Sequence, residues 1–210
     1  MSYTLDTNEA RKADSTGGMI TEIGKYVGTI TQAVEVVAGT GTKGIALTFK
    51  SNSEQKARLS IYTLKTDGTK LMGYQALMAI MTCLKLRSIT EKEGKALEWD
   101  SNEKKEVSVD AVIFPDLCNK PIGVLLETED YPKNDGGIGT RMVLKGVFQA
   151  DTELTASEIL DKKTQPQQLE RMVASLRHRP AKAAKPAATR QHSAHADSGF
   201  DGMDDDSIPF

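Results

Sequence analysis

The sequence predicts a mainly β domain with a few helices, an α+β fold built on a small antiparallel barrel. Segments rich in Val, Ile and Thr alternate in polarity with the period of a β-strand. One segment with the spacing of an amphipathic helix interrupts them after the third strand. The chain has 210 residues, of which 39% are hydrophobic and only 5% aromatic. It can therefore hold one domain with an aliphatic core, plus tails.

Three strands open the predicted barrel: Lys25–Val37, Ile45–Lys50 and Arg58–Leu64. The first is long and contains Gly28 at a position where a strand can bulge or bend. In the other two, apolar and polar residues alternate, which predicts one face toward a core and one toward solvent. The turn at 38–44 contains the pattern Gly-x-Gly-x-x-Gly, but a strand follows it. We therefore expect a hairpin turn there and not a dinucleotide site.

The spacing of apolar residues predicts a helix over about Thr69–Leu86. The next stretch, Glu91–Lys105, is highly charged and is expected to be a loop with the single tryptophan, Trp99, in its middle. The two cysteines, Cys83 and Cys118, are far apart and match no metal-ligand pattern. Both are expected to be buried free thiols.

Strand patterns resume at Val107–Phe114, Ile122–Tyr131 and Arg141–Phe148, and a Gly-rich hairpin loop joins the last two. Three strands, a helix and further strands is the element order of an OB fold, a small β-barrel whose long first strand can serve both halves of the sheet. With its Gly-Lys-Tyr start, Gly24–Phe148 resembles phage-encoded single-stranded DNA-binding or recombination-associated proteins of this fold. Another small antiparallel barrel or α+β domain remains the alternative.

Composition divides the chain into a flexible N-terminus (1–18), the barrel domain (19–150), a helical segment (151–179), a flexible linker (180–196) and an acidic tip (197–210). In the helical segment, Thr155-Ala-Ser-Glu158 has the form of a capping box. Pro166 suits the first position of a second helix. That helix carries an apolar stripe of Leu169, Met172, Val173 and Leu176. The stripe could pack on the barrel or on another subunit, which leaves a homo-oligomer open.

Charge is unevenly distributed along the chain, although the formal net charge is only −2. Residues 166–196 carry six basic side chains and one acidic one, whereas residues 197–210 carry five Asp and no basic residue. The barrel domain is nearly neutral, so any affinity for nucleic acid should be modest and should fall with salt. We find no apolar run long enough to span a bilayer and no secretory leader, which predicts a cytoplasmic protein without a membrane partner.

The acidic tip finishes in Ile208-Pro209-Phe210 and a free carboxylate. A partner with a basic rim, a Phe-sized pocket and a carboxylate-binding Arg could recognise all of it. The tip resembles that of bacterial single-stranded DNA-binding proteins, which end in a run of Asp followed by Ile-Pro-Phe and use it to recruit replication and repair enzymes. The resemblance implies that the partner-binding residues are Asp204, Asp205, Asp206, Ile208, Pro209 and Phe210. The alternative is a solvated acidic tail.

The sequence offers little for catalysis. Pro115-Asp116 followed by Glu127, Glu129 and Asp130 suggests a metal nuclease, but no Glu-x-Lys follows the Pro-Asp as that pattern usually requires. Three histidines lie in or near the linker without a Cys or carboxylate pattern around them, so no zinc site is expected. No nucleophile–base pair is evident either. We expect a binding protein with no metal or cofactor, and not an enzyme.

Binding of a single strand requires a basic groove and flat side chains on which bases can stack. Outward-facing residues of the predicted strands and residues of two loops meet this description. The candidates are Lys50, Arg58, Tyr62, Trp99, Lys104, Lys105, Lys133, Arg141 and Lys145. For some of them a structural role is the alternative, because Trp99 could plug the barrel end and Tyr62 could cover a seam.

The sequence therefore favours a phage- or prophage-type single-stranded DNA-binding protein in the bacterial host cytoplasm. The barrel would coat single strands, and the tip would recruit host replication, recombination and repair proteins. A phage recombinase or exonuclease is a further partner that the resemblance implies. The alternative is a recombination accessory or adaptor protein that binds partners through the tip without touching DNA.

Overall fold

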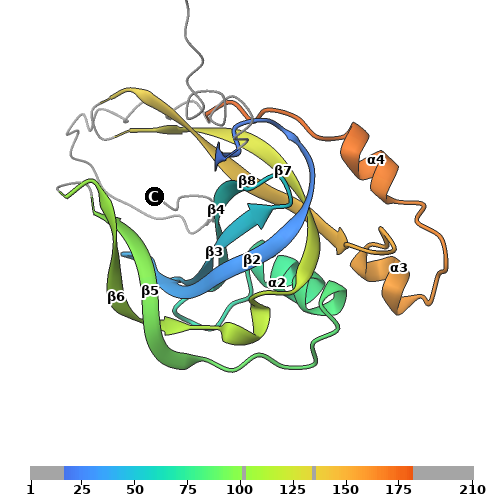
Figure 1. Cartoon of the computed structure of the whole chain (residues 1–210), viewed down its shortest axis with the longest axis horizontal. Helices are drawn as coiled ribbons and strands as arrows, with labels where there is room; N and C mark the ends of the chain where they lie inside the picture. The colour runs from blue at the N-terminus through green and yellow to red at the C-terminus, as the bar shows by residue number, and fades with distance from the viewer. Residues whose placement is uncertain (1–16, 101–102, 134–135, 182–210) are drawn as a thin grey trace, which may run out of the picture.

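A computed structural model describes residues 17–100, 103–133 and 136–181 (Figure 1). In this part of the chain the fold is mainly β with few helices, as predicted. The strands form one mixed sheet. They are β1 (Gly18–Met19), β2 (Gly24–Val37), β3 (Lys43–Ser51), β4 (Gln55–Leu64), β5 (Lys92–Asp100), β6 (Lys105–Ile113), β7 (Pro121–Pro132) and β8 (Ile138–Gln149). The helices are α2 (Met72–Cys83), the short 3-10 helix η1 (Pro115–Leu117), α3 (Ala156–Leu160) and α4 (Leu169–Ala174).

The longest strand, β2, joins the two halves of the sheet. It pairs antiparallel with β7 through Gly24–Thr29 and with β3 through Gly28–Val37. Gly28 belongs to both pairings, and a Cβ atom there would lie 2.0 Å from the carbonyl oxygen of Lys50. Only glycine fits this approach of two backbones. Because β4 also packs against β8, the sheet curls into a barrel-like shape. The prediction that the first strand serves both halves is confirmed.

The bulge in β2 lies at Thr31, three residues after Gly28. The pairing with β3 passes directly from Ile30–Phe49 to Gln32–Thr48, which leaves Thr31 without a partner residue. An extra residue in one strand reverses the alternation of its side chains. Accordingly Ile30 and Ala33 are both buried in the core, although they are three residues apart.

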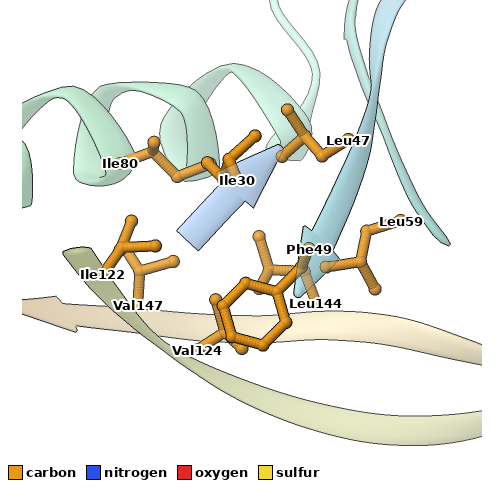
Figure 2. Close-up of a pocket in the computed structure, with 9 residues that line it drawn as sticks. All are labelled: Ile30, Leu47, Phe49, Leu59, Ile80, Ile122, Val124, Leu144 and Val147. Atoms are coloured by element: carbon orange, nitrogen blue, oxygen red, sulfur yellow. The ribbon is translucent and has the colours of Figure 1, made fainter. Parts of the chain in front are cut away.

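The core is aliphatic and densely packed, as the composition predicted. Figure 2 shows nine of its side chains pointing toward one another between α2 and the surrounding strands: Ile30, Leu47, Phe49, Leu59, Ile80, Ile122, Val124, Leu144 and Val147. The space that they leave is about 10 Å³, which is the lower limit for a single water molecule. The interior of the barrel is therefore a hydrophobic core and not a ligand cavity.

The prediction of a loop over Glu91–Lys105 is wrong, because most of this segment is strand. Lys92–Asp100 forms β5, which pairs residue by residue with β6 from Lys92–Ile113 to Asp100–Lys105. Backbone hydrogen bonds define this hairpin, and its exposed position lets it carry charged side chains along its length. The periodicity of burial that normally reveals a strand is therefore missing from the sequence.

The helix after β4 is shorter than predicted, since α2 spans Met72–Cys83. Both cysteines are free, as predicted, but only Cys83 is buried, whereas Cys118 is half-buried. Burial raises the pKa of the Cys83 thiol to about 12, so this side chain behaves as a small apolar core residue. Gly39 and Gly41 lie in the turn between β2 and β3, where Gly41 takes a positive φ of 80°, and Gly44 is the second residue of β3. The prediction of a hairpin turn is confirmed.

The capping box at the start of α3 is confirmed, and its glutamate also orders the next segment. The Glu158 carboxylate accepts the backbone N–H of Thr155 at 2.9 Å, and those of Gln167 and Gln168 at 2.6 and 3.0 Å. These two amides lie just before α4, which begins at Leu169 and not at Pro166 as predicted. Leu169 then packs on the barrel with Leu125 and Phe148, and Met172 and Leu176 adjoin them.

After α4 the chain runs beside the second half of β7. The Arg179 N–H donates to Thr128 at 2.8 Å, and its carbonyl accepts the N–H of Asp130 at 2.9 Å. This short parallel pairing covers the part of the β7 edge with which β2 does not pair. In the described part of the chain, we see no helix with the length and apolar character needed to cross a membrane.

Candidate functional site

Contacts at its base and along both of its strands attach the β5–β6 hairpin to the β2–β3–β4 part of the sheet. At its base, Ile113 of β6 pairs with Val34 of β2. Along β5, the Gln32 side chain hydrogen-bonds the backbone of Leu97. Farther along, Lys56 of β4 forms an ion pair with Glu106 of β6 at 3.8 Å. In Figure 1 the hairpin accordingly stands beside β2, β3 and β4, as a wall along that part of the sheet.

Two adjoining depressions lie between this wall and the sheet, and we call them together the hairpin groove. The first, of about 240 Å³, lies over β2, β3 and β4 and ends at β5. The second, of about 510 Å³, lies between β1, β4 and the far half of the hairpin. Arg58 lines both. Polar and small residues form much of the first depression, among them Gln32, Ala46, Thr48 and Ser60. The second contains Met19, Glu54, Lys56, Trp99 and Glu106.

The groove brings together two residues that the sequence analysis selected separately, Arg58 and Trp99. Trp99 lies on β5 and not in a loop, and 52% of its surface is exposed. It does not plug the barrel end. Arg58 is exposed on the outward face of β4, as predicted, and forms no ion pair with the described residues. Met19, also half exposed, adds apolar surface beside them. A flat indole, an unpaired guanidinium and an apolar neighbour therefore line one concave surface.

Four carboxylates line the groove, Glu35, Glu54, Glu98 and Glu106, against two cations, Lys56 and Arg58. Two lysines outside the lining, Lys43 and Lys50, bring the local charge close to neutral. Lys56 is paired with Glu106, and Lys50 at the end of β3 is paired with Glu54 at 2.5 Å. Glu35 in the first depression lies 3.5 Å from Lys43. These side chains are partly exposed, so the pairs are weak and open to competition by another anion. Attraction of a polyanion by charge alone would be modest here.

Tyr62 does not line the groove. It lies on the outward side of β4, as predicted, but it is half-buried. Cβ atoms added to Gly44 and Gly73 would come within 3.1 Å of its ring and 2.1 Å of its carbonyl oxygen, respectively. Tyr62 thus packs where β3 and the start of α2 meet. This environment fits the structural alternative, in which the ring covers a seam.

Arg141 and Lys145 lie on β8 and are engaged by carboxylates of β7. Arg141 bonds Glu129 at 2.7 and 3.0 Å and lies 5.6 Å from the ring centre of Tyr131. Lys145 lies 3.9 Å from the buried Glu127. Neither residue lines the hairpin groove. The groove and the β7–β8 surface are separate candidate surfaces.

The remaining predicted lysines lie at the ends of hairpins. Lys104 is in the β5–β6 turn, and Lys105 begins β6 and pairs with Glu103 at 2.5 Å. Lys133 is exposed in the β7–β8 connection. The predicted partner-binding residues all fall outside the residues that the structure describes. They are Asp204, Asp205, Asp206, Ile208, Pro209 and Phe210.

The carboxylates considered for a nuclease each serve a different local interaction. Asp116 in η1 accepts the N–H of Thr90 at 2.9 Å. Asp130 accepts the hydroxyl of Thr140 at 2.8 Å and lies 3.0 Å from the His178 ring, and hydrogen bonds to these two residues lower the pKa of its carboxyl. Glu127 bonds Arg179 at 2.6 Å. Among the described residues, no group of three or more histidines, cysteines or carboxylates could hold a metal ion.

Sequence analysis missed Gln32, Lys56 and Met19 as groove residues. Lys56 lies two residues before the predicted third strand, and Met19 lies in the two-residue strand β1, which pairs parallel with β4. Gln32 sits inside a segment whose alternation the Thr31 bulge reverses. No local pattern signals these positions, since each depends on pairing between distant segments.

No protein-family model matches this chain, and comparison with curated proteins also gives no match.

Proposed function

We propose that the chain is a non-catalytic single-stranded DNA-binding protein that holds DNA in the hairpin groove and recruits other proteins through its acidic tip. The observation that carries the proposal is the pairing of Trp99 with Arg58 on one concave surface. Single-strand binding needs aromatic faces for bases and cations for the backbone. An exposed tryptophan beside an arginine that is unpaired within the described part of the chain supplies one of each.

The topology supports an OB fold for this domain. In that interpretation β2, β3, β4, β7 and β8 are the five barrel strands, and α2 is the helix between the third and the fourth. The pairing of β2 with both β3 and β7, and the packing of β4 on β8, agree with a closed five-stranded barrel. The β5–β6 hairpin is then an insertion after α2 that walls one face. OB folds bind oligonucleotides on such a strand face, flanked by loops.

The near-neutral groove predicts how this binding should respond to salt. If a bound strand displaces glutamates from one to three lysines or arginines, log affinity should fall with log salt at a slope of roughly −0.7 to −2. Stacking on Trp99 should then account for a large share of the affinity. A slope several times steeper would place the DNA on another, more basic surface.

The acidic tip is proposed to act in partner recruitment, as its resemblance implies. The Asp residues would steer association with a basic rim, and Phe210 would fill a pocket. Deleting residues 197–210 should leave single-strand affinity unchanged or slightly higher while abolishing capture of a protein that binds such tips. Phe210→Ala in the full chain should remove most of that capture. Equal loss of both activities on deletion would contradict the division of roles.

The decisive measurement for the body is a fluorescence-anisotropy titration of labelled oligo-dT at low and high salt. Saturable binding at low salt, with quenching of Trp99, is expected. The neutrality of the groove keeps a second candidate in consideration, a recombination accessory or adaptor that contacts only proteins. Absence of binding at low salt would favour the adaptor, whatever the tip captures.

A further inference from the structure

The side-chain amide of Gln32 bonds a strand that lies 65 residues away in the sequence. Its Nε2 donates to the Leu97 carbonyl at 3.1 Å, and its Oε1 accepts the Leu97 N–H at 2.8 Å. A primary amide offers one acceptor and two donors in a plane. Gln32 therefore satisfies both backbone groups of one β5 residue, as a neighbouring strand would.

Gln32 reaches β5 only because of the bulge in β2. With regular alternation, the residue two positions after the inward-facing Ile30 would also face the core. The extra residue Thr31 reverses this, so Ala33 enters the core and Gln32 points to the outer face, opposite Thr48. The Thr31 hydroxyl donates to the Thr48 carbonyl at 3.1 Å, which ties the bulge to β3. The bulge thus aims a polar side chain at the hairpin.

The bonded groups of Leu97 lie on the edge of β5 that β6 does not use. In an antiparallel pair, successive residues of a strand direct their N–H and C=O groups alternately toward the partner and away from it. Both groups of Leu97, which is opposite Ser108, are taken by Gln32 and so point away from β6. This edge borders the first depression, which Gln32 and Leu97 both line. Trp99 follows two residues later, so its backbone N–H and C=O groups lie on the same edge of β5.

We propose that Gln32 is a positioning residue that holds the β5–β6 hairpin as the wall of the hairpin groove and so fixes Trp99 opposite Arg58. The proposal rests on the proposed function for its ligand, but the clamp itself can be tested without DNA. At its base the hairpin is joined to β2 by the Val34–Ile113 bridge and by the Phe114 N–H, which donates to the Ala33 carbonyl. Beyond that base, the polar contacts between the hairpin and the sheet, within the described residues, are this pair of bonds and the exposed Lys56–Glu106 pair. The Gln32 amide is therefore the main polar attachment of β5 itself.

The test uses Gln32→Met in the full chain, which keeps the length of the side chain and removes both bonds. Gln75→Met, on the exposed face of α2, is the matched control. Amide exchange of Leu97 should be about tenfold faster or more in Gln32→Met, because two net hydrogen bonds are lost. Emission from Trp99, the single tryptophan, should change, and affinity for labelled oligo-dT should fall about tenfold. Gln75→Met should match the parent in Leu97 exchange, in Trp99 emission and in affinity for oligo-dT.

The outcomes separate the clamp from the function. Unchanged Leu97 exchange and Trp99 emission in Gln32→Met would overturn the clamp. Altered exchange and emission with unchanged oligo-dT affinity would show that the clamp does not position a DNA site. If the parent chain itself binds no oligo-dT, the proposed function fails, and exchange and emission still decide whether Gln32 holds the hairpin.

Gln32→Glu distinguishes the bonds from the size of the side chain. At neutral pH its carboxylate can accept the Leu97 N–H but cannot donate to the carbonyl. Exchange of Leu97 should lie between those of the parent and Gln32→Met. Protonation on acidification restores a donor, so the difference from the parent should narrow as the pH falls. A purely steric role for Gln32 would leave Gln32→Glu equal to the parent at every pH.

Discussion

Two sides of this domain use charged residues in opposite ways. On the side where the chain returns to β7, the carboxylates of Glu127 and Glu158 are fully buried and bonded to arginine or to backbone amides. In the hairpin groove, Arg58 is unpaired with any described residue and Lys56 has only a long, exposed ion pair. Breaking the first set of interactions would leave an uncompensated charge in the interior. Breaking the second set costs little free energy.

The comparison shows why a basic residue on a sheet does not by itself indicate a nucleic-acid site. Arg141, Lys145 and Arg179 are all cationic, but each faces a carboxylate of β7. Lys145 and Arg179 neutralise the buried Glu127, and Arg141 pairs with the partly exposed Glu129. We therefore expect their loss to reduce stability, and the loss of groove residues to reduce affinity.

The largest effect should come from Arg179→Ala. It leaves Glu127 buried with only Lys145, at 3.9 Å, as a countercharge. One oxygen of this glutamate, Oε1, has no hydrogen-bond partner among the described residues even in the parent. The free energy of unfolding in urea should fall by about 3 kcal/mol. The exposed Arg177→Ala should change it by less than about 0.5 kcal/mol. Equal effects would mean that the buried pair does not hold the C-terminal segment on β7.

Glu158→Gln should destabilise the protein next most, in a pH-dependent way. Burial raises the pKa of this carboxyl, but bonds from Thr155, Gln167 and Gln168 outweigh burial and lower the pKa to about 2. Because the pKa is lower in the folded state, the ionised carboxylate stabilises the fold at neutral pH, by roughly 2 kcal/mol. That contribution disappears as the pH falls from the unfolded value of about 4.3 to about 2. Urea unfolding at several pH values should show the two proteins converging in acid, and a constant difference would contradict this origin.

Trp99→Ala should have the largest effect on the groove side. Loss of one stacking surface should weaken oligo-dT binding by about 1–3 kcal/mol, or roughly 5- to 150-fold. The unfolding free energy should change little because Trp99 is half exposed. Met72→Ala removes another exposed apolar side chain, on α2, and should leave affinity unchanged. Anisotropy with labelled oligo-dT measures both. Retention of full affinity in Trp99→Ala would remove the groove as the binding surface.

The smallest predicted effect is a gain in affinity for oligo-dT. Glu106→Gln releases Lys56 from its ion pair, so oligo-dT affinity at low salt should rise about two- to threefold and the salt slope should steepen by about 0.7. Glu153→Gln, which breaks the exposed pair with Lys25 on another part of the surface, is the control and should change neither. A loss of affinity in Glu106→Gln would indicate that the pair holds the groove wall and does not compete with DNA.

The barrel strands could be predicted from sequence because each has one face in the core. Leu47 and Phe49 in β3, and Leu59 and Ile61 in β4, follow the expected period of two. The same local logic placed Arg58 correctly on the outward face. The capping box at Thr155 is likewise a local signal, since its bonds span three residues.

The groove could not be predicted, because it is assembled by contacts between distant segments. Arg58 and Trp99 meet only when the β5–β6 hairpin lies along the sheet. That position depends on Gln32, whose direction depends on a bulge that sequence alternation does not reveal. The carboxylate partners of Arg141 and Lys145 are also set by cross-strand pairing. Sequence patterns therefore identified cationic candidates but could not tell exposed ones from those engaged in structure.

The charged composition of β5 has a consequence for how copies of this protein meet. The strand ends the main path of the sheet, and an open edge is a template on which another chain can add a strand. Lys92, Glu93, Lys95 and Glu98 place charges of both signs along this edge. Edge-to-edge stacking of two hairpins would have to desolvate them. The side chains that hid the strand from a pattern search thus make the addition of another chain to this edge of β5 costly.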